Sequence, residues 1–214
     1  MIETFISLIL HVDVHLLELL QNYGPWIYAI LFLIIFVETG LVVMPFLPGD
    51  SLLFVVGALA AAGGLSLPLV IVLLLIAAIL GDGVNFATGA WFRRKTLEGK
   101  QYRWPNPEHL RFTHEYFERH GGKTIIIARF VPIVRTLAPF VAGIGQMHYG
   151  RFALYNVTGA VLWVVSLTVA GYMLGNVPWV KENLTAVLMG IIVLSLMPGF
   201  IAWIKAKAQR PASQ

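Results

Sequence analysis

The sequence predicts an all-α membrane protein with two facing re-entrant helical hairpins in an inverted repeat, about three full transmembrane helices and flanking amphipathic helices. First, 58% of the 214 residues are hydrophobic and only 12% are charged, about half the charged share of a soluble domain. Second, several apolar runs reach the roughly 20 residues that a helix needs to cross a bilayer. Third, two apolar runs contain paired prolines, and proline interrupts a helix.

The composition also excludes other classes of protein. The chain contains no cysteine, which rules out disulfides, thiolate nucleophiles and cysteine-ligated zinc. Eight basic and four acidic residues lie in the window 93–123, which therefore holds the whole net charge of +4. These basic residues flank apolar spans, as the positive-inside rule expects of a membrane protein. No nucleic-acid partner is therefore predicted.

The N-terminal part is predicted to form a surface helix and a first hairpin within a single membrane domain, 1–214. Polar residues recur every three or four positions in 1–24, which is typical of an amphipathic helix lying on the membrane. The run 26–67 is interrupted by Pro45 and Pro48. Backbone freed in lipid must be buried in protein or line a wet cavity, so 26–67 is predicted to be re-entrant hairpin 1.

The middle of the chain is predicted to contain one full span, one loop and a second hairpin. The apolar run 68–92 is predicted to be a transmembrane helix, and 93–123 a cytoplasmic loop. The run 124–145 contains Pro132 and Pro139, so by the same argument it is predicted to be re-entrant hairpin 2.

Charge parity supports this topology. Residues 152–175 and 184–204 are predicted transmembrane helices, followed by a basic tail, 205–214. The loop 93–123 and the tail are both basic, so both are expected in the cytoplasm, with an even number of crossings between them. The two helices supply that even number only if 124–145 enters and leaves on the same side. The two hairpins would then enter from opposite faces.

Charges inside apolar segments point to function. They are Glu38, Asp50, Asp82, Arg129 and Arg135. Each costs about 2.5–3.5 kcal/mol at a helix centre, so such residues usually face a partner or a water-filled cavity. We expect the two acids of the first hairpin to meet the two arginines of the second. The alternative is that these residues serve only as ion pairs that hold the hairpins together.

The chemistry of these side chains suggests an anionic substrate. Arginine grips phosphate oxygens with a planar fork, and broken helix ends add N–H groups for an anion. Arg129 and Arg135 are therefore the predicted substrate-binding residues. A carboxylate removed from water favours its protonated form, so Glu38 and Asp50 are predicted to couple transport to protons.

Other polar and aromatic residues receive weaker interpretations. Asp82, Asn85 and Asn156 are accessory candidates, and the two asparagines fit interhelical hydrogen bonding better than ligand binding. The segment Gly171–Gly175 fits a motif for close helix packing. The tryptophans are interpreted as interfacial anchors or lipid-facing bulk rather than a binding box: Trp26, Trp91, Trp163, Trp179 and Trp203.

Enzyme motifs mostly fail, so neither catalytic residues nor a cofactor nor a metal is predicted. His114 and Glu115 resemble the start of a zinc-binding helix, but that motif needs a second histidine where Glu118 stands. No glycine loop that would hold the phosphates of ATP occurs. An embedded lipid-modifying enzyme is accordingly the least favoured reading.

Several motifs together resemble the DedA family of bacterial inner-membrane proteins, which carry the VTT (SNARE-associated) domain. The similarity covers nearly the whole chain. Separately, residues 46–50 weakly resemble residues 130–135, which is consistent with an internal repeat. The motifs are Glu38-Thr-Gly40, Phe46-Leu-Pro48-Gly49-Asp50-Ser51, Gly81-Asp82, Arg129-Phe-Val-Pro132-Ile-Val-Arg135, Ala142-Gly143 and Tyr155-Asn156-x-x-Gly159-Ala160-x-x-Trp163.

The resemblance implies a multi-pass inner-membrane protein with two facing re-entrant hairpins. It also implies translocation of undecaprenyl phosphate or a phospholipid, dependence on the proton motive force, and essential roles for Glu38, Asp50, Arg129 and Arg135. The expected partners are a lipid or lipid phosphate, protons and the bilayer. Assembly into a homo-oligomer is a further possibility that the sequence does not decide. Two alternatives remain: a proton-coupled carrier of a small ion, and a non-transporting scaffold for envelope integrity.

Overall fold

The computed structural model describes residues 24–41, 49–98, 122–182, 186–187 and 190. Within these ranges the chain forms helices and turns and contains no strand, so the all-α prediction is confirmed there. The predicted amphipathic helix 1–24 lies almost entirely outside the described residues. The same holds for most of the loop 93–123, most of the predicted helix 184–204, and the tail 205–214.

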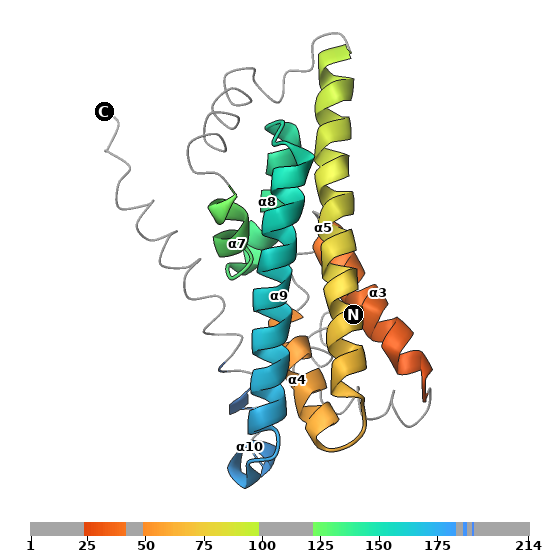
Figure 1. Cartoon of the computed structure of the whole chain (residues 1–214), viewed down its shortest axis with the longest axis vertical. Helices are drawn as coiled ribbons and strands as arrows, with labels where there is room; N and C mark the ends of the chain where they lie inside the picture. The colour runs from red at the N-terminus through yellow and green to blue at the C-terminus, as the bar shows by residue number, and fades with distance from the viewer. Residues whose placement is uncertain (1–23, 42–48, 99–121, 183–185, 188–189, 191–214) are drawn as a thin grey trace, which may run out of the picture.

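Two long helices form the frame of the molecule. Helix α5 spans Leu67–Glu98 and helix α9 spans Tyr149–Leu174, and they run in opposite directions along the long axis (Figure 1). Within them, Leu67–Lys95 and Tyr149–Leu174 are long and apolar enough to cross a membrane. Helix α5 continues beyond position 92, so the first basic residues of the expected loop lie on this helix.

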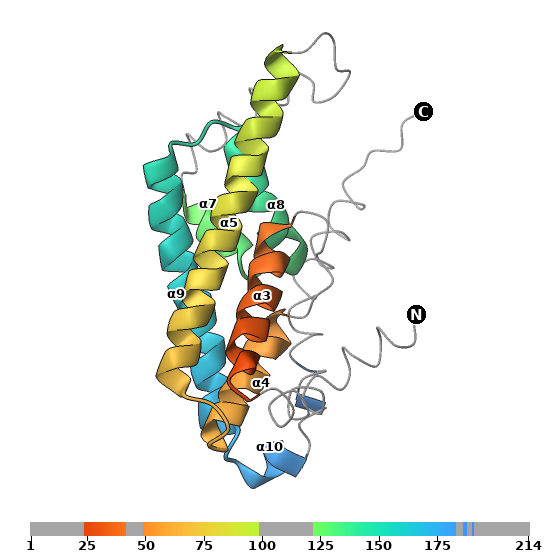
Figure 2. The ribbon, with the colours of Figure 1, turned by 90° about the vertical axis from the view of Figure 1, so that its right-hand side faces the viewer.

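Two pairs of shorter helices pack against this frame. Helices α3 (Trp26–Gly40) and α4 (Gly49–Ala61) form the first pair. Helices α7 (Lys123–Ala128) and α8 (Pro132–Ile144) form the second pair. The first pair lies in the half of the molecule nearer to the short helix α10 (Pro178–Glu182), and the second in the opposite half (Figures 1 and 2). That these pairs are re-entrant stays a prediction.

The two prolines of the second pair have different effects. Pro132 stands at the start of α8, where its missing N–H has no helical partner to lose. Pro139 was expected to interrupt the segment, but α8 continues through it. That expectation was wrong, and only Pro132 coincides with the break between α7 and α8.

Helical spacing explains why a carboxylate enters the core. Ile27, Leu31 and Ile35 are buried on one face of α3, and Glu38 follows on the same face, 1% exposed. The neighbouring helix α4 is buried on most sides, with Leu53 and Val55 fully covered. The apolar face of α3 therefore carries Glu38 inward, toward the start of α4.

Glycines allow two close helix crossings, one between α4 and α9 and one between α8 and α5. A Cβ on Gly57 of α4 would overlap the Thr168 carbonyl of α9, and one on Gly171 would overlap the Phe54 carbonyl of α4. These contacts bear out the packing role expected for the Gly171–Gly175 segment. At the other crossing, Gly143 of α8 meets the Phe86 carbonyl of α5, and Gly89 of α5 meets the Phe140 carbonyl of α8. The second helix of each short pair therefore packs on the long helix that follows the other pair, whereas α3 packs on α5 and α7 packs on α9.

Candidate functional site

The helix ends of both short pairs bring the predicted charged residues together. Glu38 lies in the last turn of α3, and Asp50 lies in the first turn of α4. Arg129 directly follows α7, and Arg135 lies near the start of α8. Glu38 and both arginines are at most 4% exposed. The breaks in the two pairs thus meet in a buried, charged region.

Arg135 joins the two pairs through a guanidinium fork. Its Nη1 donates to Asp50 Oδ1 at 2.8 Å, and its Nη2 donates to Glu38 Oε1 at 2.5 Å. A guanidinium that engages two carboxylates in this way is held in one orientation. One arginine of the second pair therefore contacts both acids of the first pair, as the sequence led us to expect.

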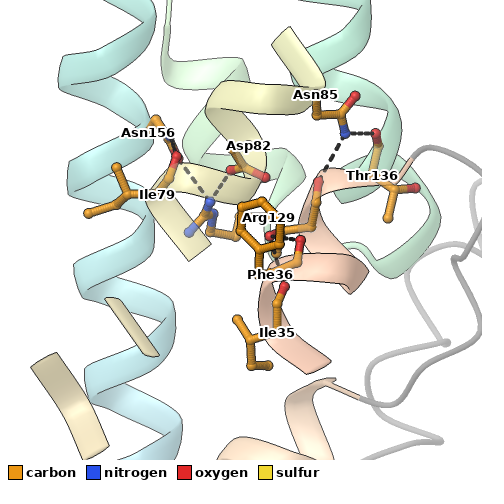
Figure 3. Close-up of polar contacts among 9 residues, drawn as sticks. Ile35, Phe36, Ile79, Asp82, Asn85, Arg129, Thr136 and Asn156 are labelled. Carbon is orange, nitrogen blue, oxygen red and sulfur yellow. Dashed lines mark hydrogen bonds and ion pairs between the residues drawn. The ribbon is translucent and has the colours of Figure 1, made fainter. Parts of the chain in front are cut away.

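Arg129 has a different partner from the one expected. Its Nη2 forms an ion pair with Asp82 of α5 and donates to Asn156 Oδ1 of α9 at 2.9 Å (Figure 3). The expectation that both arginines would meet Glu38 and Asp50 is therefore corrected for Arg129. Asp82, predicted to be an accessory residue, is a direct member of the charged cluster.

The two asparagines brace the helices around the ion pairs. Asn85 Nδ2 donates to the carbonyls of Thr39 and Thr136, which ties α5 to α3 and α8 (Figure 3). Asn156 Nδ2 donates to the Ile79 carbonyl at 3.1 Å, which ties α9 to α5. These are the interhelical bonds expected of both residues. Asn156 also contacts Arg129, so it belongs to the site as well.

Trp163 is a site residue that the sequence interpretation missed. We expected an interfacial or lipid-facing ring, but Trp163 is only 1% exposed, and its Nε1 donates to Asp50 Oδ1 at 2.7 Å. Its ring centroid lies 4.6 Å from the Arg135 guanidinium carbon and 5.7 Å from that of Arg129. Both distances are within cation–π range. Because Trp163 follows Asn156 by two helical turns, helical periodicity would have placed it on the same face of α9.

Gly49 allows Glu38 to approach the start of α4. A Cβ at position 49 would overlap the Glu38 carboxylate, so a larger residue would displace this acid. The N-terminus of a helix carries partial positive charge and favours a nearby carboxylate. Glu38 is therefore held both by Arg135 and by the start of α4.

Several buried polar atoms of the cluster have no protein partner. They are Arg129 Nη1 and Arg135 Nε among donors, and Glu38 Oε2, Asp82 Oδ1 and Asn85 Oδ1 among acceptors. Cationic donors without a protein partner can bind an anion, and an unpaired carboxylate oxygen can take a proton. Within the described part of the chain, no group of three or more acidic or histidine side chains is arranged to hold a metal ion.

Removing the indole N–H tests the contact between Trp163 and Asp50. Trp163→Phe keeps a ring beside the arginines but deletes a hydrogen bond to a charged group, which costs about 1.5–3 kcal/mol. We expect that loss in the free energy of unfolding, measured by chemical denaturation in detergent micelles. The control is Trp26→Phe, since Trp26 is 71% exposed. Equal stability of the two variants would show that the indole N–H contributes little.

Comparisons with known proteins point to one family of membrane proteins. The model of the VTT domain matches residues 47–173. The chain is 56% identical to Protein DedA of Escherichia coli (strain K12), over 97% of this chain and 95% of that protein. It is 40% identical to Inner membrane protein YqjA of the same strain, over 81% of this chain and 80% of that protein. It is also 40% identical to Uncharacterized membrane protein ML0287 of Mycobacterium leprae, over 79% and 76%. No solved structure matches the chain.

Proposed function

Since the chain belongs to the DedA family of VTT-domain membrane proteins, we propose that it moves a lipid phosphate between the leaflets of the bacterial inner membrane, coupled to protons. The substrate class is undecaprenyl phosphate or a phospholipid. The family relationship makes the chain a membrane protein; the substrate and the coupling are our proposal. No catalytic residue, cofactor or metal is part of it, and the partners are the lipid, protons and the bilayer.

The observation that carries the proposal is the pair of buried arginines with unused donors. Arg129 Nη1 and Arg135 Nε have no protein partner although both side chains are buried. A phosphate has several acceptor oxygens and prefers the planar fork of arginine to a point charge. We propose that the phosphate binds these donors and competes with the carboxylates that hold the guanidinium groups in its absence.

The charge balance of the cluster motivates the proton coupling. Three carboxylates, those of Glu38, Asp50 and Asp82, face two guanidinium groups, so the fully ionised cluster would carry one net negative charge. An uncompensated charge is costly in the membrane interior. An anion entering this cluster adds further negative charge. In the proposed cycle, Glu38 and Asp50 take up protons when the phosphate displaces them from Arg135, and release them when it leaves.

Two other functions make different predictions. A carrier of a small ion would use the same cluster, but it would give a substrate-dependent proton flux in vesicles whose lipid distribution does not change. A scaffold would keep its function after Glu38→Gln and Asp50→Asn, provided that the protein still folds. The buried arginine donors favour lipid phosphate over the scaffold, because ion pairing alone does not require unused donors.

The decisive experiment is a translocation assay with a panel of headgroups. Purified protein is reconstituted into liposomes that contain labelled polyprenyl phosphate, phosphatidylethanolamine or phosphatidylcholine, with and without a pH gradient. We expect Arg129→Ala to reduce translocation about 10- to 100-fold, the scale of losing a contact to a charged group. Arg151→Gln is the control, because Arg151 is an exposed cation at the start of α9. Translocation by Arg129→Ala at the wild-type rate would overturn the proposal.

A further inference from the structure

An apolar groove lies along the C-terminal half of α5, away from the ion pairs. It has a volume of about 430 Å³ and is lined by Phe86, Ala87, Ala90, Trp91 and Arg94 of α5 and by Tyr149 at the start of α9. The α5 positions recur at helical spacing, so they form one stripe along one face of the helix. Phe86 forms the buried floor, 8% exposed, and stacks on Phe152.

The rim of the groove is aromatic and basic. Trp91 and Tyr149 are 54% and 61% exposed. Arg94 is exposed, and Lys95 Nζ lies 4.8 Å from the centroid of the Trp91 ring. None of the residues that line the groove is acidic. Exposed tryptophan and tyrosine beside basic residues are typical of the level of lipid headgroups, and basic pockets between transmembrane helices bind anionic headgroups.

We propose that this groove binds one anionic phospholipid, with an acyl chain against Phe86, Ala87 and Ala90 and the phosphate at Arg94 and Lys95. The apolar lining requires a hydrocarbon ligand, and the basic rim selects a negatively charged headgroup. A free phosphate would leave the apolar lining unused, so the occupant is a lipid.

The lining of the groove begins one helical turn from the buried cluster. Phe86 follows Asp82 by four residues on α5, which is about 6 Å along the helix axis. Under the proposed function, on which this one step rests, the lipid in the groove occupies the position from which a phosphate approaches Arg129. Binding in the groove itself does not depend on translocation.

Native mass spectrometry of the purified full chain tests the proposal with defined lipids. We expect retention of phosphatidylglycerol to exceed that of phosphatidylcholine, and Arg94→Gln to weaken phosphatidylglycerol binding about fivefold. Ala87→Trp places a ring in the groove and is expected to abolish retention. The matched controls are Thr88→Trp, at an exposed neighbouring position that does not line the groove, and Arg151→Gln.

The outcomes separate this proposal from the proposed function. Equal retention of the two lipids, or retention that Ala87→Trp does not change, would contradict the proposed lipid site in the groove. Loss of retention in Arg129→Ala but not in Ala87→Trp also overturns it, because the lipid would then bind at the buried cluster. Selective retention that Ala87→Trp abolishes supports the groove even if the protein moves no lipid in the translocation assay.

Discussion

Arg135→Ala is expected to abolish lipid translocation and to destabilise the protein by about 3–5 kcal/mol. The reason is that Arg135 compensates two carboxylates at once, the buried one of Glu38 and that of Asp50, which is 14% exposed. Without the guanidinium group, both acids lose their cation, and the Glu38 carboxylate remains buried. Translocation is measured in proteoliposomes, and the free energy of unfolding by denaturation in mixed micelles.

A neutral triple variant separates the stabilising role of this fork from its role in transport. In Arg135→Met/Glu38→Gln/Asp50→Asn all three charges are removed together, so that no charge of this fork is left without its partner, which is the strongly destabilising case. We expect this variant to recover much of the lost stability but no translocation. Arg135→Lys is expected to be intermediate in stability, since an ammonium group lacks the planar fork.

Two results would contradict this account of Arg135. If Arg135→Ala were as stable as the wild type, the ion pairs would not be part of the folded membrane protein. If the neutral triple variant translocated lipid at the wild-type rate, the charged residues would serve only to hold the helices together. That second outcome would favour the interpretation of these residues as structural ion pairs.

Gly171→Val is expected to destabilise the protein by about 3 kcal/mol or more. A Cβ at this position would overlap the backbone carbonyl of Phe54, and a backbone group on a packed helix has no alternative rotamer. Helices α4 and α9 must therefore separate, which moves Asp50 away from Trp163. The expected results are a lower free energy of unfolding and a loss of translocation.

Gly83→Ala is the matched control for this substitution. Gly83 also lies within a long helix, but a Cβ there would meet nothing within 4 Å. Alanine in a helix interior is favoured over glycine by roughly 0.5–1 kcal/mol, so this variant should be at least as stable as the wild type. If Gly171→Val behaved like Gly83→Ala, the α4–α9 crossing would be wider than described.

The sequence was sufficient to find most of the charged cluster but not its pairing. Glu38, Asp50, Arg129 and Arg135 stood out because charges in apolar runs are costly. Which acid meets which arginine depends on how the helices pack, and local sequence carries little of that information. Asp82 was therefore underestimated, because nothing in the local sequence indicates that it pairs with Arg129.

Aromatic residues and prolines were harder to interpret for a related reason. Tryptophan is a residue type typical of interfacial anchors, but Trp163 is buried because it lies on the face of α9 that meets α4. Pro139 has the chemistry of a helix breaker, yet α8 tolerates it, as membrane helices do when neighbouring groups satisfy the freed backbone. In both cases tertiary packing outweighs the local preference.

The α4–α9 and α8–α5 crossings have a consequence for how the protein is made. During synthesis, α3, α4 and α5 leave the ribosome before α7, α8 and α9 exist. At that stage α4 lacks the helix against which its Gly57 packs, and Glu38 and Asp50 lack Arg135. The first half alone therefore has no guanidinium group for these two acids, which favours their protonated form in lipid, and it leaves one face of α4 without its packing partner. Since each half supplies packing and charge partners for the other, we expect the docking of the two halves to be a late step of biogenesis.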